Sequence, residues 1–268
     1  MNPVFQLAGG SMVGRDHRMV NKNNQDSYVI QSYSDLTVAV VADGCGSGAK
    51  TEVGSQLGAR LVAEQIARAY GAYRTIDWQK TQRHVLSQLD LLAQNLGGDF
   101  RRVVEEYFLF TIVGVVLEPK KATFFACGDG TIYVNGCHLP LGPFAGNMPP
   151  YIAYGLLENE LKIDVREVRL APVVELATSD LTSFLIGTDG IDDFVGHEAR
   201  MMPGIDRLVG PIDQFWTDDR YFRGNPDLVS RQLRLVGRDW PLSNPEHGLL
   251  HDDTTLIVGR RIPELQEE

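Results

Sequence analysis

Short apolar runs and helical periodicities alternate along the first hundred residues. Leu36–Ala42 is apolar and rich in β-branched side chains, which predicts a buried strand. From Thr51 to Tyr70, and again up to Gly97-Gly98, apolar residues recur at the spacing of an amphipathic helix. The apolar positions that carry these two patterns are Val53, Leu57, Leu61 and Ile66, then Val85, Leu89, Leu92 and Leu96. The pattern predicts one strand followed by two helices.

The middle of the chain predicts an antiparallel hairpin. Two β-rich apolar runs, Phe108–Leu117 and Ala122–Cys127, are separated only by a short turn that contains Pro119. A parallel connection would need a dozen residues or more, so a simple doubly wound sheet is excluded for this part. Further on, we expect a strand ending at Thr188, a helix over Asp227–Val236 and a last strand over Thr254–Val258. This mixture of antiparallel pairs and helices predicts an α+β fold.

Length, composition and charge narrow the class of protein. The 268 residues, 43% of them hydrophobic, predict a single large domain over residues 1–262, followed by an acidic tail over 263–268. No apolar run approaches the roughly 20 residues of a membrane span, and the first residues do not resemble a signal peptide, so we expect a soluble, cytoplasmic protein without a membrane partner. The formal net charge of −10 argues against a nucleic-acid partner.

Acidic residues mark the ends of several predicted strands. Asp43, Asp129 and Asp189 each follow an apolar run and precede a glycine, and Asp252-Asp253 directly precedes the last strand. One Asp-Gly pair after a strand is ordinarily a turn, because Asp bonds to nearby backbone amides and Gly tolerates a positive φ. Four acidic strand ends in one domain are harder to explain this way. If the strands are neighbours, the carboxylates meet at one edge of the sheet.

Carboxylates that meet in this way need cations. Two unit charges about 4 Å apart repel by roughly 4 kcal/mol at an effective dielectric near 20, so three such pairs oppose folding by on the order of 10 kcal/mol. The three cysteines, Cys45, Cys127 and Cys137, form no C-x-x-C pair, and we expect them to be reduced thiols rather than zinc ligands. All-oxygen ligands favour Mg²⁺ or Mn²⁺. Two such ions sharing one carboxylate are typical of phosphate-ester hydrolysis.

Five motifs, in this order, resemble the metal-dependent Ser/Thr protein phosphatases of type 2C. They are Asn24-Gln25-Asp26-Ser27, the run from Val41 to Gly48, Ala126-Cys127-Gly128-Asp129-Gly130, the run from Ile186 to Asp193, and the run from Asp252 to Val258. The likeness extends over nearly the whole chain and is greatest for a bacterial subgroup with Gln-Asp in the first motif. It implies a central sandwich of two antiparallel β-sheets with helices on both outer faces.

The resemblance also implies a role for each matching position. Asp43 would bridge two Mg²⁺ or Mn²⁺ ions, and the Gly44 carbonyl would ligate one of them. Asp189 and Asp252 would hold the other ion, and Asp129 with Asp189 would suit a weaker third one. Asp26 would orient water at the metals. The implied reaction is one-step attack of a metal-bridging hydroxide on phosphoserine or phosphothreonine of a protein substrate, opposing a bacterial Ser/Thr kinase.

Some positions depart from the family pattern. Gln25 and Cys45 stand where many members have Glu and His. The family often places an Arg that grips phosphate five residues before the first-motif Asp, and here that residue is Asn21. Arg18 is our prediction for the replacement, with Lys22 and Arg15 as alternatives. For His17, a role in orienting substrate or water and a structural role in the loop both stay open.

The segment from Cys137 to Ser183 differs most from the family pattern. It contains several prolines and a strand-like run over Leu161–Leu170. We expect a short lid stiffened by proline, on which Phe144, Tyr151 and Tyr154 form either a docking face or local packing.

Three functions are compatible with these residues. The leading hypothesis is a Mg²⁺- or Mn²⁺-dependent Ser/Thr phosphoprotein phosphatase. The first alternative is a non-catalytic regulatory or scaffold domain of the same fold, suggested by the altered phosphate-gripping position, although a decayed site has no need to keep mutually repelling carboxylates. The second is an unrelated metal-dependent hydrolase that acts on small phosphoesters.

Overall fold

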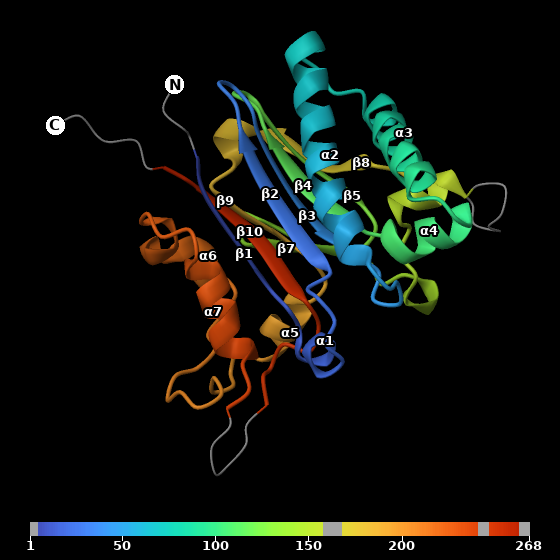
Figure 1. Ribbon diagram of the computed structural model, residues 1–268. Coiled ribbons are helices and arrows are strands. Elements are labelled where there is room, and N and C mark those ends of the chain that lie inside the picture. The colour runs from blue at the N-terminus through green and yellow to red at the C-terminus, as the bar shows by residue number, and fades with distance from the viewer. Residues whose placement is uncertain (1–4, 158–167, 241–246, 263–268) are drawn as a thin grey trace.

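Two five-stranded antiparallel sheets form the centre of the protein. The computed structural model describes residues 5–157, 168–240 and 247–262. The first sheet has the order β1-β10-β9-β6-β7 and the second β2-β3-β4-β5-β8 (Figure 1). The strands of the first are Phe5–Met12, Thr254–Arg261, Ser183–Gly187, Gly130–Val134 and Cys137–Leu141, in that order. Those of the second are Asp26–Ser32, Thr37–Asp43, Ile112–Leu117, Lys121–Cys127 and Ala171–Ala177.

Helices cover the outer face of each sheet (Figure 1). Against the second sheet lie α2 (Thr51–Tyr73), α3 (Trp78–Leu96) and α4 (Phe100–Tyr107). Against the first lie α5 (Ile191–Gly196), α6 (Gln214–Thr217) and α7 (Leu228–Gly237), and the short α1 (Arg15–Met19) follows β1. This is the α+β sandwich, with helices on both faces, that the resemblance implies. No helix in the described ranges is long and apolar enough to cross a membrane.

The core between the sheets explains why the central strands are apolar without interruption. Every residue of β4 is buried, since one face contacts the opposite sheet and the other contacts the helices. Across the sandwich, Phe124 of β5 meets Phe184 of β9 edge to face, with ring centroids 5.8 Å apart. The predicted hairpin is confirmed, because Leu117 pairs with Ala122 and Ile112 with Cys127.

The two predicted helices are present, but the first part of α2 buries a different face from the one its large apolar residues suggest, whereas Ile66 further along is buried as the pattern predicts. Val53 and Leu57 are 36% and 37% exposed, whereas Gly54, Gly58 and Ala59 are buried. A Cβ atom on Gly58 would lie 2.2 Å from the ring of Phe110, and one on Gly54 would lie 2.0 Å from the Tyr107 carbonyl oxygen. Small residues therefore let α2 approach the chain between α4 and β4 closely.

Two glycines of α2 allow a matched test of this packing. Gly58→Ala is expected to lower the free energy of unfolding by about 1–3 kcal/mol, because overpacking against Phe110 outweighs the better helix propensity of alanine. Gly71→Ala in the same helix meets nothing within 4 Å and is expected to raise it by about 0.5–1 kcal/mol. Urea unfolding of both variants measures the difference. Equal effects would contradict the packing described here.

Other sequence expectations have mixed outcomes. The helix α7 lies within one residue of its predicted range, and β10 continues three residues beyond the predicted Val258. Tyr151 is buried and Tyr154 packs against it with ring centroids 5.3 Å apart, so local packing holds for these two rather than a docking face. The strand expected over 161–170 falls mostly on residues outside the described ranges, and its end, 168–170, is not a strand. The acidic tail over 263–268 also lies outside them.

Candidate metal centre

Antiparallel pairing brings the acidic strand ends to one end of the sandwich. In the first sheet, β9 ends just before Asp189, and its neighbours β10 and β6 begin just after Asp253 and Asp129. In an antiparallel pair the end of one strand lies beside the start of the next, so these carboxylates share an edge. In the second sheet, Asp26 at the start of β2 pairs with Asp43 at the end of β3. The expected convergence is present, and it involves both sheets rather than one.

Mutual repulsion links five acids at this end of the sandwich, whereas the ligand atoms that lie within 4.8 Å of one another among the described residues are those of His17, Asp252 and Asp253. We call Asp26, Asp43, Asp129, Asp189 and Asp252 the acid cluster. Burial raises the pKa of Asp43 well above its usual range, and the charges of the other four members raise it further. Burial, and then the charge of Asp189, raises the pKa of Asp129 to about 6. The pKa of Asp252 is raised by burial and by Asp189. Burial raises the pKa of Asp189, and a hydrogen bond with the Asp43 carboxyl opposes this rise.

Buried oxygens without donors indicate what the acid cluster can bind. Thr188 donates to Asp26 Oδ2 at 2.7 Å, but Asp26 Oδ1 is buried and has no hydrogen-bond partner among the described residues. The same holds for Asp189 Oδ1. Burying an unpaired polar atom is unfavourable, and carboxylate oxygens are the ligands that hard divalent cations prefer. The residues present therefore fit Mg²⁺ or Mn²⁺.

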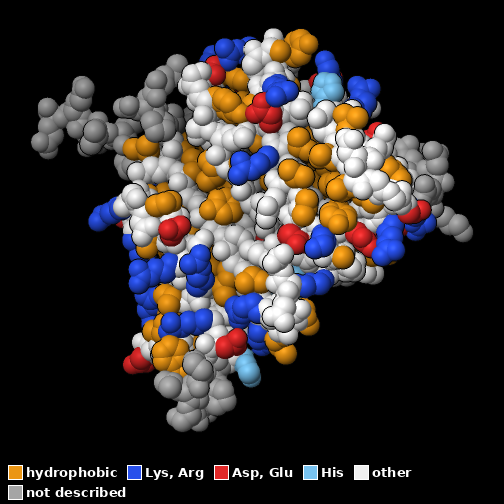
Figure 2. Space-filling view, in the orientation of Figure 1, with side chains coloured by type: hydrophobic (Ala, Val, Ile, Leu, Met, Phe, Trp, Pro, Cys, Tyr) orange, Lys and Arg blue, Asp and Glu red, His pale blue; other side chains and the backbone are white. Residues whose placement is uncertain are grey.

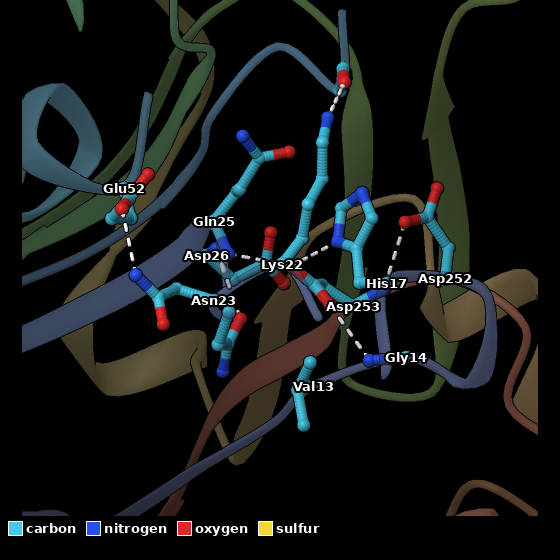
Figure 3. Close-up of polar contacts among 12 residues, drawn as sticks. Val13, Gly14, His17, Lys22, Asn23, Gln25, Asp26, Glu52, Asp252 and Asp253 are labelled. Atoms are coloured by element: carbon cyan, nitrogen blue, oxygen red, sulfur yellow. Dashed lines mark hydrogen bonds and ion pairs between the residues drawn. The ribbon is translucent and has the colours of Figure 1, made fainter. Parts of the chain in front are cut away.

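Asp253 is a structural carboxylate that sequence reasoning did not single out. It is 3% exposed, and it accepts hydrogen bonds from the backbone N–H groups of Gly14 and Gln25, both at 2.6 Å (Figure 3). Its Oδ2 also lies 2.9 Å from His17 Nδ1. One buried side chain thus joins the start of β10 to the loops that carry α1 and the start of β2. The Asp252-Asp253 pair was visible in the sequence, but nothing in it distinguished the two roles.

Asp193 holds the backbone beside Asp252 in place. Its Oδ2 accepts hydrogen bonds from the N–H groups of His251 and Asp252, at 2.6 and 3.2 Å. The residue belongs to the fourth motif, yet its spacing there suggested no partner. Asp193 therefore positions a candidate ligand from a distance of 59 residues along the chain.

Two residues next to Asp43 fix the loop after β3. Gly44 donates its N–H to the Gln25 carbonyl at 3.0 Å, and a Cβ here would lie 2.8 Å from the carbonyl oxygens of both Gln25 and Thr51, so only glycine fits. The Gln25 side chain donates to Gly48 O at 3.2 Å and to Thr51 Oγ1 at 2.7 Å. Its Oε1 is buried and has no hydrogen-bond partner within the described part of the chain. The amide thus braces the loop while keeping one acceptor oxygen unused.

The candidate phosphate-binding residues differ in where their side chains go. The Arg18 guanidinium donates to the Gly237 carbonyl at 2.6 Å and lies 3.4 Å from Asp239, so it ties α1 to the end of α7. Arg18 as a phosphate ligand stays a prediction, and it requires these bonds to break. Lys22 extends past His17 and Asp26 to donate to the Gly46 carbonyl (Figure 3). His17 lines an open pocket together with Asp189 and Asp252.

Comparison with models of protein families identifies the family to which this chain belongs. The model described as Protein phosphatase 2C matches residues 13–215, three quarters of the chain. The chain belongs to the protein phosphatase 2C family. Four members of the acid cluster lie inside the matched range, and Asp252 lies beyond it.

Solved structures share the protein phosphatase 2C fold. Serine/threonine phosphatase Stp1 from Staphylococcus aureus has 13% identity and a TM-score of 0.54, covering 98% of this chain and 97% of that one. PppA of Pseudomonas aeruginosa has 21% identity and a TM-score of 0.51, covering 97% and 99%. The catalytic domain of the phosphatase PstP, in complex with two manganese ions, has 14% identity and a TM-score of 0.50, covering 97% and 99%. The search of curated protein sequences gave no match.

The raised carboxyl pKa values predict opposite effects of pH on the metal-free and metal-loaded protein. Asp129, with its pKa raised to about 6, binds its proton more tightly when folded, so its contribution to metal-free stability is lost as the pH rises through about 6. Metal binding needs the ionised carboxylates, so stabilisation by Mn²⁺ grows over the same range. At saturating Mn²⁺, about 100 times Kd, it is expected to reach about 3 kcal/mol.

Thermal unfolding at pH 5.5 and 7.5, with and without Mn²⁺, measures both effects. The Mn²⁺-induced rise in Tm is expected to be larger at pH 7.5. In Asp129→Asn, the part of this pH dependence that comes from Asp129 should be lost. An equal rise at both values of pH would show that these carboxyls do not hold the metal.

Proposed function

We propose that this protein is a Mg²⁺- or Mn²⁺-dependent phosphatase that hydrolyses phosphoserine and phosphothreonine in protein substrates. The observation that carries the proposal is the acid cluster itself, in which carboxylates from both sheets meet and at least two buried oxygens have no donor among the described residues. Membership of the protein phosphatase 2C family supports the same chemistry. The proposed counterpart is the Ser/Thr kinase that phosphorylates the same substrate.

The metal ligands proposed are those the family resemblance implies. Asp43 would be shared by two ions, with the Gly44 carbonyl on one of them and Asp189 and Asp252 on the other. Asp129 and Asp189 would hold a weaker third ion, and Asp26 would orient water. When bound, the ions supply charge neutralisation and water activation. The two manganese ions in PstP support a site of this kind in the fold.

The chain's own residues bind and orient the substrate. Lys22 lies beside Asp26 of the acid cluster (Figure 3), and within the described part of the chain its ammonium donates only to the Gly46 carbonyl, which a phosphate oxygen can replace. His17 Nδ1 lies 2.9 Å from Asp253 Oδ2 without the alignment of a hydrogen bond, and its Nε2 is available for a phosphate oxygen or water. Arg18 orients α1 through Gly237 and Asp239. We therefore favour Lys22 over Arg18 as the cation that meets phosphate.

The Michaelis constant distinguishes these two cations. Lys22→Met is expected to raise KM for a phosphothreonine peptide about tenfold, because it removes a charge-assisted hydrogen bond to the bound phosphate. Arg18→Met is expected to lower thermal stability and to change KM less. Steady-state kinetics of both variants, with Tm measured in parallel, gives the comparison. A larger increase in KM for Arg18→Met than for Lys22→Met would indicate that Arg18 binds the phosphate.

A non-catalytic regulator of the same fold is the alternative, favoured by the engagement of Arg18 at the end of α7. Release of inorganic phosphate from a phosphothreonine peptide, with Mn²⁺ and then with EDTA, separates the two. A phosphatase releases phosphate only with the metal. No release at any metal concentration would support the regulator, and a preference for nucleotides or sugar phosphates over phosphopeptides would indicate a small-phosphoester hydrolase instead.

A further inference from the structure

Two pockets of opposite charge adjoin each other at the metal end of the sandwich. The acid pocket, of about 490 Å³, is lined by five carboxylates, including Asp189 and Asp252, with His17 and His251. The second pocket, of about 670 Å³, is lined by the cationic or imidazole side chains of Arg15, His197, Arg200, His247 and His251. We call it the basic pocket. No carboxylate lines it among the described residues, and His251 belongs to both pockets.

The basic pocket is unusual for a chain whose formal net charge is −10. The guanidinium of Arg200 is exposed and has no hydrogen bond or ion pair with any residue in the described ranges. Positive side chains also gather on the neighbouring α6–α7 layer (Figure 2), where Arg231 and Arg234 are exposed, whereas the exposed Arg220 and Arg223 form ion pairs with Asp218 and Asp219. An anion held at this end of the molecule therefore meets its most favourable potential in the basic pocket, at Arg200, rather than beside the five carboxylates of the acid pocket.

Hydrogen bonds fix the donors on one wall of the basic pocket. Arg15 Nη2 lies 2.5 Å from His251 Nδ1. Because a guanidinium can only donate, His251 Nδ1 is the acceptor, and the ring carries its proton on Nε2. His197 Nδ1 lies 2.6 Å from the Asp193 carbonyl, so its N–H is used there and the neutral ring offers no second donor; the ring stacks with that of His251 at 6.3 Å. Guanidinium and imidazole N–H groups are suited to bind an oxyanion.

We infer that the basic pocket binds a second oxyanion of the substrate, a carboxylate or phosphate side chain close in sequence to the residue that is dephosphorylated. The inference rests on the proposed function. His251 is adjacent to Asp252 and lines both pockets. The basic pocket is therefore next to the acid pocket, where the phosphate that is hydrolysed would bind. A side chain two residues away along an extended peptide lies about 7 Å from the first, which is a suitable reach. The preferred substrates are thus acidic or multiply phosphorylated segments.

Three phosphothreonine peptides test the inference, with alanine, glutamate or phosphoserine placed two residues to either side of the phosphothreonine, and tandem mass spectrometry follows loss of the phosphothreonine phosphate alone. The wild-type protein is expected to show a kcat/KM about tenfold higher for the acidic peptides, the size of one charge-assisted hydrogen bond. Arg200→Gln should reduce this preference to about twofold and leave the alanine peptide unchanged. The glutamate and phosphoserine peptides distinguish carboxylate from phosphate as the favoured group.

Arg83→Gln serves as the matched control, because Arg83 is an exposed arginine of α3, on the other sheet. It is expected to keep the full preference. An equal kcat/KM for all three peptides in the wild type, or a preference retained in Arg200→Gln, would overturn the inference.

A binding measurement separates failure of the pocket from failure of the proposed function. Fluorescence anisotropy compares product peptides, with threonine in place of phosphothreonine and either glutamate or alanine flanks. Suppose that no peptide is hydrolysed, but that glutamate-flanked peptides bind about tenfold more tightly than alanine-flanked ones and lose this advantage in Arg200→Gln. The basic pocket then binds an oxyanion, and the proposed phosphatase activity is wrong. If the peptides are hydrolysed but their affinity does not depend on the flanking residues, the inference about the basic pocket is wrong and the proposed phosphatase activity is unaffected.

Discussion

Asp43→Asn is expected to lower kcat/KM for a phosphothreonine peptide by about 10³-fold or more, equivalent to about 4 kcal/mol of transition-state stabilisation. The reason is that Asp43 lies among all the other acid-cluster carboxylates and is the ligand proposed to serve two ions. Loss of one shared ligand weakens both metal positions. Steady-state assays at saturating Mn²⁺ measure this effect, and a rate equal to the wild type would refute the metal assignment.

The same substitution is expected to stabilise the metal-free protein. The pKa of Asp43 is raised by burial and by four neighbouring acids, so its ionised form is unfavourable in the folded state. This penalty begins to appear as the pH rises past the unfolded-state pKa of 3.8, and it is absent only well below that value, where the group is protonated in both states. Metal-free Asp43→Asn should therefore melt at a higher temperature than the wild type at pH 7.5, but it should gain little from Mn²⁺.

Asp192→Asn is the matched control for Asp43→Asn. Asp192 is exposed on the wall of the acid pocket and belongs to no proposed ligand set. The substitution makes the same chemical change within the same field, and kcat/KM should stay within about threefold of the wild type. A collapse of activity here as large as in Asp43→Asn would mean that overall charge, rather than ligation, controls turnover.

Asp253→Ala is expected to lower the free energy of unfolding by about 2–5 kcal/mol. The change removes the acceptor of two buried backbone N–H groups, those of Gly14 and Gln25, and each loses a charge-assisted bond. His17 also loses the carboxylate that lies 2.9 Å from its Nδ1. Urea unfolding at pH 7.5 measures the loss. Asp253→Asn, which keeps one acceptor oxygen, should be less destabilised.

The neighbouring residue supplies the control for Asp253→Ala. Asp252 is exposed, and its raised pKa means that its charge is unfavourable in the metal-free fold. Asp252→Ala should therefore leave metal-free stability unchanged or slightly higher, and should diminish the stabilisation by Mn²⁺. If the two alanine variants were equally destabilised without metal, the division between a structural and a ligating aspartate would be wrong.

Local sequence patterns predicted those parts of the fold that depend on local physics. The hairpin at Pro119 followed from a turn too short for any other connection, and the end of α3 from the glycines at 97 and 98. The buried face of α2 was not predictable in this way. Glycine and alanine contribute little to an apolar pattern, yet Gly54 and Gly58 form the contact because their size admits a neighbouring backbone.

In the candidate site, too, some features follow from local sequence and others only from long-range contacts. The sequence by itself determined which aspartates end or begin strands and, through the order of the motifs, which family they resemble. Only the tertiary structure decided that Asp253 braces two loops while Asp252 faces the pocket, that Arg18 joins α7, and that a basic pocket adjoins the acidic one. The physical reason is that these roles depend on partners tens to hundreds of residues away, and long-range pairing in a sandwich sets which side chains meet.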